Sequence, residues 1–481
     1  MFRKSILVTQ SVAVRRAQST SAFSSSLDSL QQNAAAGVYM QREAPRSRRK
    51  DVVLLHPPGT CSQFTRSGSR YPPLGLCQLK AVIGDAASVD VLEADGLVLS
   101  ANQTMARLRA DMPRAVGMTI TCGTKRLVNA WATVAKNLCP GYEPIVVAGG
   151  PSVAFESSEI LRDCAAVDVV VKGEGEVTFP EIVAVLRTHQ DAPRDVLLAM
   201  LSPIAGVVVR GRPEMNDVRI PTVPKDDFAA LPFPDLSDSP VANYWAPDAN
   251  GLSPMVTMMT QRGCPGKCGF CNTPQIHGQQ LRGWSNEQVV TELMRLKAAH
   301  GLRAVSFVDD VFTNRPFGGP RRLCQMMVDA RLDLRWYCNA RADGVSPLIA
   351  AAMKAAGCFQ VFMGFESGCD AMLRRIGKGE TTAQLVRGAR VLKDAGIAIS
   401  IGFIVGLPEE SQASVDKTIA LCNLVQPDRV QFTRYTPIKG SPLAGSHGLA
   451  ASSGFHDRDN GDRVEAWIAQ CYAACRFGPA L

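Results

Sequence analysis

Short apolar runs alternate with longer amphipathic segments along most of the chain, starting at Asp51. Five runs rich in β-branched residues predict strands at 52–55, 89–92, 116–120, 145–148 and 167–171. Apolar residues at helical spacing predict helices at 75–84, 102–111, 124–138, 157–163 and 178–187. This alternation is typical of a parallel sheet covered by helices, so residues 51–200 are expected to form a doubly wound, Rossmann-like domain.

A second α/β series follows at residues 251–445. Its predicted strands are 255–260, 304–308, 335–339, 360–365, 398–405 and 429–435, and its clearest helices are 285–300 and 382–395. Six units are fewer than the eight of a closed barrel, so we expect a partial (β/α)6 barrel. The proline- and aspartate-rich stretch 201–250 is expected to be a linker, and 446–481 a short C-terminal extension.

The formal net charge of +8 is concentrated at the N-terminus. Residues 1–50 hold nine basic side chains and two acidic ones, so the rest of the chain is close to neutral. A folded body without a basic excess lacks the electrostatic footprint of a nucleic-acid-binding protein, and no such partner is expected. No transmembrane segment is expected either, because the most apolar stretch, 395–407, is shorter than the roughly 20 residues that span a bilayer.

The first 27 residues have the composition of a targeting segment. They contain four basic residues, no acidic residue and a serine-rich run from Ser19 to Ser26. This composition is typical of a transit peptide and predicts a mitochondrial or plastid protein. The alternative is a disordered basic tail on a cytoplasmic protein.

The chain has fifteen cysteines, and most of them are isolated in apolar segments, where cysteine acts as a small buried hydrophobic residue. Cys264, Cys268 and Cys271 differ, because they share one loop rich in glycine, directly after the first predicted strand of the second domain. Three thiolates this close together can hold a [4Fe-4S] cluster and leave one iron open. The alternative is a zinc site completed by His277, which would make the domain a non-catalytic metal-binding scaffold.

The loop resembles the motif of the radical S-adenosylmethionine superfamily, Cys-x3-Cys-x-aromatic-Cys, with Phe270 at the aromatic position. The resemblance implies that the open iron chelates S-adenosylmethionine. It also implies that an electron, delivered by a reducing donor protein, cleaves this cofactor to a 5′-deoxyadenosyl radical.

A distant element strengthens the resemblance. Residues 402–409 match the superfamily's Gly-x-Ile-x-Gly-x-x-Glu element, which implies an adenine-binding edge at Gly402, Ile404, Gly406 and Glu409. A scaffold without catalytic function would have no need of such an edge.

Three charged positions at predicted strand ends are assigned by the same resemblance. Glu366 corresponds to the carboxylate that binds the ribose, and Arg341 could pair with the methionine carboxylate of the cofactor. Asp309, with Asp310, stands where many relatives carry Gly-Gly-Glu to bind the methionine amino group. The competing interpretation is that each of these residues forms a structural salt bridge or caps a strand.

The first domain resembles that of the cobalamin-binding subfamily. The resemblance rests on glycine-rich turns after the predicted strands and implies contacts to cobalamin at Gly149, Gly150, Gly173 and Glu174. It also implies methylation of an unactivated carbon in a small molecule or a lipid. The alternative within the subfamily is a radical cyclisation or rearrangement, as in the anaerobic porphyrin ring cyclases.

The cobalt ligand of other cobalamin domains is absent from the sequence. Their Asp-x-His-x-x-Gly motif is reduced here to His56-x-x-Gly59, and Leu54 replaces the aspartate that would orient the imidazole. His56 is therefore expected to be a strand-end residue rather than a cobalt ligand.

Overall fold

The computed structural model describes residues 49–60, 70–121, 123–212, 220–245, 252–446 and 458–475. The predicted transit peptide lies outside these residues. The chain divides into two compact units. Unit 1 comprises residues 1–66, 75–221 and 237–239, and unit 2 comprises residues 67–74, 222–236 and 240–481. The expected linker 201–250 is thus divided between the two units rather than lying outside both.

Unit 1 is a six-stranded sheet with the strand order β2-β1-β3-β4-β5-β6. Its strands are β1 (Val52–His56), β2 (Val89–Glu93), β3 (Ala115–Thr119), β4 (Ile145–Gly149), β5 (Val169–Val171) and β6 (Val207–Val209). Its helices are α3 (Leu74–Ile83), α4 (Ala101–Asp111), α5 (Lys125–Lys136), α6 (Ser157–Asp163), α7 (Gly175–Thr188) and α8 (Arg194–Leu201). Strands β1 to β5 are parallel, which confirms the doubly wound fold.

One strand of unit 1 was not predicted. Strand β6 pairs antiparallel with β5, as Val169↔Val209 and Val171↔Val207, and adds an edge within the expected linker. Its three valines are buried. Three residues are too few to display the period of a strand, which explains why the pattern did not reveal it.

Unit 2 is built on a parallel sheet with the order β14-β13-β12-β11-β10-β7. Its strands are β7 (Met255–Met258), β10 (Ala304–Phe307), β11 (Arg335–Asn339), β12 (Cys358–Glu366), β13 (Ala398–Val405) and β14 (Arg429–Arg434). Two short strands, β8 (Gln261–Arg262) and β9 (Arg282–Gly283), form a separate antiparallel pair. Six parallel strands in sequence order confirm the partial barrel.

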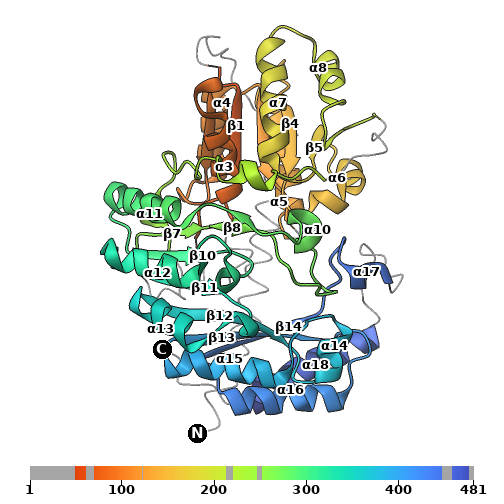
Figure 1. The fold of residues 1–481 in the computed structure, drawn as a ribbon. Helices are drawn as coiled ribbons and strands as arrows, with labels where there is room; N and C mark the ends of the chain where they lie inside the picture. The colour runs from red at the N-terminus through yellow and green to blue at the C-terminus, as the bar shows by residue number, and fades with distance from the viewer. Residues whose placement is uncertain are drawn as a thin grey trace. The chain divides into compact units, whose positions relative to one another are not determined.

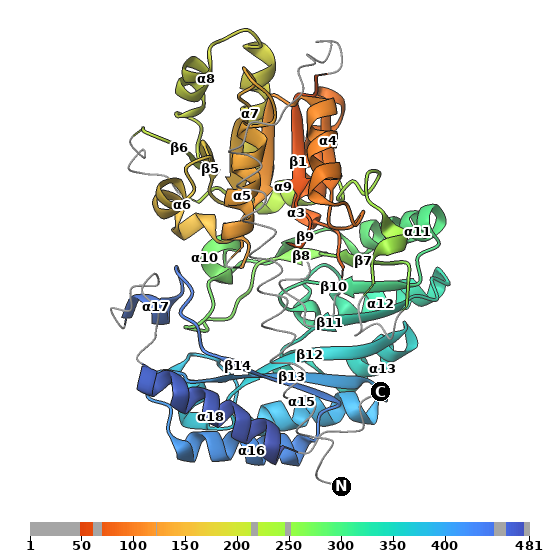
Figure 2. The same ribbon diagram turned by 180° about the vertical axis from the view of Figure 1, so that it is seen from behind.

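Helices cover the outer face of this sheet (Figure 1). The helices on that face are α11 (Asn286–His300), α12 (Gly319–Asp329), α13 (Pro347–Ala355), α15 (Thr382–Asp394), α16 (Gln412–Val425) and α18 (Arg458–Ala474). Four shorter helices, α9 (Lys225–Phe228), α10 (Thr273–His277), α14 (Asp370–Arg375) and α17 (Pro442–Ser446), complete the described part of unit 2. Both views show α15, α16 and α18 side by side along β13 and β14 (Figures 1 and 2). No helix in the described part of the chain has the length and apolar character that crossing a membrane requires.

The two faces of β12 and β13 differ in burial. Met363, Phe365, Ile401 and Phe403 are at most 1% exposed and form the core between the sheet and its helices. The alternate positions, Phe362, Gly364, Gly402 and Ile404, are only partly buried. Because side chains alternate across a strand, these partly buried positions share the inner face of the sheet.

Candidate functional site

The cysteine loop lies between β8 and α10, and its two ends are joined by the β8–β9 pair. Gly263 begins the loop with φ of +99°, and a Cβ there would lie 2.4 Å from the Gln280 carbonyl oxygen. Only glycine tolerates both constraints. Farther along the loop, the Gly269 N–H donates to the Ile376 carbonyl at 2.7 Å, and the Leu443 N–H donates to the Gly269 carbonyl at 2.8 Å. The loop is therefore held by backbone bonds from two other parts of unit 2.

The three thiols of the loop are partly exposed, and two of them accept backbone hydrogen bonds. The Thr273 N–H donates to Cys271 Sγ at 3.4 Å, and a backbone hydrogen bond from Gly266 reaches Cys264. Burial raises the pKa of Cys264 and Cys268, and only part of this rise is offset by positive charges nearby. The thiolate forms therefore need a bound cation, such as the irons of a cluster.

Glycine keeps the space between the thiols clear. A Cβ at Gly266 would lie 3.3 Å from Cys264 Sγ and 3.8 Å from Cys268 Sγ. In a [4Fe-4S] cluster each cysteine binds a different iron, so three thiols that surround an open space can hold it. The loop fits a cluster held by three thiolates.

Asp309 is a structural residue in this protein. Its carboxylate is fully buried and accepts hydrogen bonds from Thr260 N and Thr260 Oγ1, both at 2.5 Å. Burial raises the pKa of Asp309 to about 6, although these hydrogen bonds lower it in part. The side chain ties the end of β10 to the residues before the cysteine loop. Both carboxylate oxygens of Asp309 accept hydrogen bonds from Thr260 in this structure.

Asp310, the second aspartate at this position, lies near the cysteine loop. It accepts a hydrogen bond from Thr273 Oγ1 at 3.5 Å and lies close enough to Cys264 to raise the pKa of that thiol. Desolvation raises the pKa of Asp310, and the nearby charge of His277 lowers it. Of the two aspartates, Asp310 is the one placed to meet a group bound at the cysteine loop.

Glu366 ends β12 in an unusual backbone conformation. Its φ is +63°, and the pairing of β12 with β13 shifts register between Gly364 and Glu366. A bulge of this kind re-aims a side chain at a strand end, and a left-handed non-glycine residue is typical of functional sites. The Glu366 carboxylate is buried and is held by the Lys378 ammonium, 3.2 Å away.

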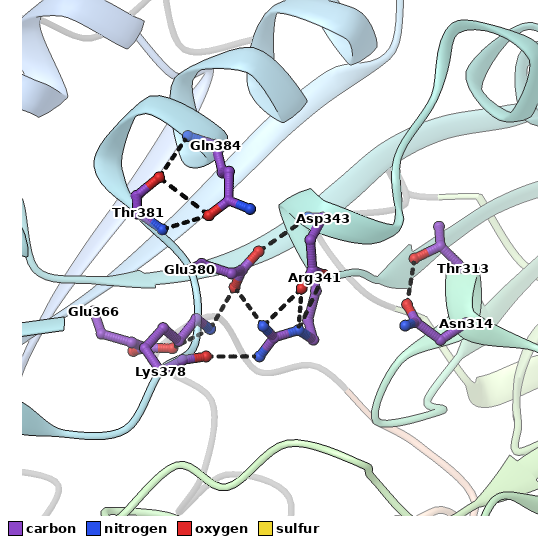
Figure 3. Close-up of polar contacts among 9 residues, drawn as sticks. All are labelled: Thr313, Asn314, Arg341, Asp343, Glu366, Lys378, Glu380, Thr381 and Gln384. Carbon is purple, nitrogen blue, oxygen red and sulfur yellow. Dashed lines mark hydrogen bonds and ion pairs between the residues drawn. The ribbon is translucent and has the colours of Figure 1, made fainter. Parts of the chain in front are cut away.

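Arg341 is bound on several sides in the same cluster of charges (Figure 3). Its Nε and Nη2 donate to the Asp343 carboxylate at 3.1 and 2.9 Å, and its Nη1 donates to the Lys378 carbonyl at 3.0 Å. Glu380 Oε2 lies 3.5 Å from Arg341 Nη2. The guanidinium fork expected to bind a carboxylate of the cofactor is thus already paired with Asp343 in this structure.

Lys378 and Glu380 were not identified from the sequence. They follow α14 in the segment Gly377-Lys378-Gly379-Glu380, and both side chains are buried, at 6% and 5% exposure. The available signal was a lysine between two glycines, followed by a glutamate just before a helix. Their partners are Glu366 at the end of β12 and Arg341 after β11. These residues are distant in sequence, so the sequence did not show that the four side chains meet.

The inner face of β13 carries Gly402 and Ile404, two of the positions assigned to adenine. Gly402 pairs with Gly364 of β12, so two residues without side chains lie next to each other in the middle of the inner face. Phe270 of the cysteine loop is half-buried. The two glycines make room for neighbouring side chains, since a Cβ at Gly402 would lie 2.8 Å from Phe362 Cζ and one at Gly364 would lie 2.2 Å from Glu366 Oε1.

The turn after β13 uses a different glutamate from the one that the motif indicated. Glu409 is 64% exposed in its side chain and forms an ion pair with Arg375. The Glu410 carboxylate instead accepts from the backbone N–H groups of Gly406 at 2.5 Å and Leu407 at 3.2 Å. Burial raises the pKa of Glu410, and these two hydrogen bonds lower it. Glu410 therefore holds the turn that contains Gly406, where φ is +86°.

Two unpaired polar atoms lie at the carboxyl edge of the unit 1 sheet. His56 ends β1 and Asp95 follows β2, with exposures of 9% and 8%, and neither His56 Nδ1 nor Asp95 Oδ2 has a hydrogen-bond partner. Burial lowers the pKa of His56 to about 4, although Asp95 raises it in part. Buried polar atoms without partners are rare, and this edge is where doubly wound sheets bind ligands. The two atoms fit a ligand rich in amides, such as cobalamin.

The glycines assigned to cobalamin have structural reasons to be glycine. A Cβ at Gly173, with φ of +84°, would lie 2.3 Å from the Pro221 carbonyl oxygen, and one at Gly150 would lie 2.7 Å from the Ile120 carbonyl oxygen. Gly149 meets nothing closer than 3.9 Å. Glu174 is buried at the start of α7, and its N–H donates to the Pro221 carbonyl. At Gly150 and Gly173 the protein backbone fills the space that a ligand was expected to use.

Replacing any one of the three loop cysteines by alanine should lower the iron content of the anaerobically reconstituted protein by at least half. The reason is that a cluster bound by two thiolates is held weakly. Cys139→Ala is the matched control, because Cys139 is a partly exposed thiol of unit 1. Bound zinc in place of iron in the unmodified protein would contradict the cluster assignment.

Glu410→Ala should destabilise the protein by about 1–3 kcal/mol, since two backbone N–H groups lose their acceptor. Glu409→Ala, which removes one exposed ion pair, should cost under about 1 kcal/mol. Urea unfolding followed by fluorescence would compare the two variants. The reverse order would mean that Glu409 rather than Glu410 holds the turn.

Comparisons with known proteins agree with the two sites. The profile of the radical SAM superfamily matches residues 258–422, and the profile of the B12 binding domain matches residues 64–183. A protein of Pyrococcus horikoshii, named as an uncharacterized methyltransferase, is 31% identical over 396 residues, which cover 82% of each chain. The anaerobic magnesium-protoporphyrin IX monomethyl ester cyclase of Rubrivivax gelatinosus is 24% identical, over 82% of this chain and 69% of the cyclase.

A solved structure shares the fold. It is the cobalamin-dependent S-adenosylmethionine radical enzyme OxsB with aqua-cobalamin and S-adenosylmethionine bound, which superposes with a TM-score of 0.71 at 17% identity. The superposition covers 92% of this chain and 72% of that one. With both domains in this order and a similar relative along most of its length, the chain belongs to the radical S-adenosylmethionine superfamily, in the group with an N-terminal cobalamin-binding domain.

Proposed function

We propose that this enzyme is a cobalamin-dependent radical S-adenosylmethionine methyltransferase that acts on an unactivated carbon of a small molecule or a lipid. The observation that carries the proposal is the 31% identity to a methyltransferase of the same length, extending through both domains. The two sites support it, because the cysteine loop fits a cluster and the carboxyl edge of unit 1 has buried polar atoms free for a ligand.

The residues of the chain would divide the work as follows. Cys264, Cys268 and Cys271 hold the cluster, while Glu366 and the inner face of β12 and β13 bind the nucleoside of S-adenosylmethionine. His56 and Asp95 would hydrogen-bond cobalamin. When bound, the cluster supplies the electron that cleaves S-adenosylmethionine, and cobalamin supplies the methyl group. The electron would come from a reducing donor protein.

A radical cyclase is the second candidate, because a ring cyclase is also among the similar proteins, at 24% identity. Both candidates need the same cluster and the same cleavage of S-adenosylmethionine. They differ in whether the methyl group of the cofactor is transferred, so only a label in that methyl group separates them.

The test uses the reconstituted enzyme with S-adenosylmethionine labelled in its methyl group, reduced cobalamin and a low-potential reductant. A methyltransferase should give labelled methylcobalamin together with S-adenosylhomocysteine, in addition to 5′-deoxyadenosine. Deoxyadenosine without any transfer of label would favour the cyclase. Absence of both products from an iron-loaded enzyme would reject both candidates.

We also propose that residues 1–50 direct the protein to a mitochondrion or a plastid, on the basis of their basic, serine-rich composition. A fluorescent protein fused behind these residues should accumulate in the organelle. The same fusion with Arg3, Lys4, Arg15 and Arg16 changed to glutamine should stay in the cytoplasm. Equal distribution of the two fusions would reject the targeting role.

A further inference from the structure

Lys378 is a buried cation between two carboxylates. Its Nζ lies 3.2 Å from Glu366 Oε1 and 3.5 Å from Glu380 Oε2, and Figure 3 shows the lysine reaching between these two side chains. Only 6% of the residue is exposed. A lysine is rarely this buried unless it is paired, and here the pairing joins the end of β12 to the segment before α15.

The backbone conformation at Glu366 directs its side chain toward Gly364 and Lys378. Its positive φ and the bulge before it turn the carboxylate back over Gly364. A Cβ at Gly364 would lie 2.2 Å from Glu366 Oε1 and 3.4 Å from Lys378 Nζ, so glycine is needed to make room for the ion pair. The backbone sets the direction of the side chain, and Lys378 fixes its end.

The same turn also reaches the other groups of the site. The Lys378 carbonyl accepts a hydrogen bond from Arg341 Nη1 at 3.0 Å. A Cβ at Gly377 would lie 2.8 Å from the Lys267 carbonyl oxygen, and the Ile376 carbonyl accepts from the Gly269 N–H in the cysteine loop. The turn 376–380 therefore connects Glu366, Arg341 and the cysteine loop through direct contacts.

The buried charges of this cluster balance, because Arg341 and Lys378 face the carboxylates of Glu366 and Glu380, while the third carboxylate, Asp343, is exposed.

We propose that Lys378 is a positioning residue for S-adenosylmethionine that acts through Glu366. Lys378 holds the Glu366 carboxylate at the inner edge of β12, where it can accept hydrogen bonds from the hydroxyl groups of a ribose. The inference rests on the proposed function only in requiring that this enzyme binds S-adenosylmethionine.

The test measures binding rather than turnover. The enzyme is reconstituted with its cluster in the oxidised state, without cobalamin or reductant, and the dissociation constant for labelled S-adenosylmethionine is measured by equilibrium dialysis. Lys378→Met should weaken binding at least tenfold, with iron content and cluster absorbance unchanged. Lys378→Arg, which keeps the charge, should stay within about threefold of the unmodified enzyme. Lys417→Met, a change of an exposed lysine on α16, is the control and should have no effect.

A double-variant cycle shows whether Lys378 acts through Glu366. Glu366→Gln should weaken binding to a similar extent, and adding Lys378→Met to it should cause no further loss, because the two residues work as a unit. The double variant also removes both buried charges together, so it tests the proposal even if Lys378→Met alone does not fold.

Three results would overturn the inference. The first is that Lys378→Met binds S-adenosylmethionine as tightly as the unmodified enzyme. The second is that the fold-losses of affinity of the two single variants multiply in the double variant. The third is that Lys378→Met or the double variant loses iron. The last would assign the lysine to the cluster instead. If the unmodified enzyme with a full cluster does not bind S-adenosylmethionine, the proposed function fails as well, so the two failures are distinguishable.

Discussion

The parallel direction of the strands in unit 2 is the constraint on which the site depends. Parallel strands end at the same edge of a sheet, so residues that follow β10, β11, β12 and β13 meet there although they are far apart in sequence. Asp310, Arg341, Glu366 and Gly406 all lie just beyond strands or at their ends. The cysteine loop follows β7 and β8 at this edge, which places the thiols beside the charged cluster.

Burying so many charges is costly, and the network around Lys378 shows how the fold limits that cost. An isolated buried carboxylate or ammonium would be neutralised or would destabilise the fold, whereas here each charged group has at least one partner of opposite sign. Burial still raises the pKa of Glu366, and Lys378 lowers it again in part. Such networks rigidify a site, which suits an enzyme that must hold its cofactor in one geometry.

In unit 1, two buried polar side-chain atoms lack hydrogen-bond partners at the sheet edge. Asp168 is paired within the protein, since it accepts from the Val146 N–H at 2.8 Å and pairs with Lys136 at 2.5 Å. His56 Nδ1 and Asp95 Oδ2 have no such partner, and both residues lie at the edge where this fold binds ligands. The position two residues before His56 is Leu54, so the chain has no aspartate there. The aspartate that lies near His56 is Asp95, which follows the neighbouring strand β2.

The sequence by itself determined the fold class, the family and the thiols of the cysteine loop. These depend on local information: the period of apolar residues, and a motif in which three cysteines are close together along the chain. The six strands of the unit 2 sheet and the two helices given bounds, α11 and α15, were predicted to within two residues at each end. Strand β6 and the short pair β8 and β9 were missed, because runs of two or three residues are too short to show a period.

Only the tertiary structure decided which charged residues are buried and which partners they bind. Asp309 and Asp310 are adjacent in sequence, as are Glu409 and Glu410, and the motifs could not tell which member of each pair is buried and bonded to backbone. Lys378 and Glu380 acquire their partners from β12 and from the residues after β11, so their place in the site depends on contacts between distant segments. Hydrogen bonds and ion pairs of this kind have no sequence period, because the partners are set by how the sheet brings strand ends together.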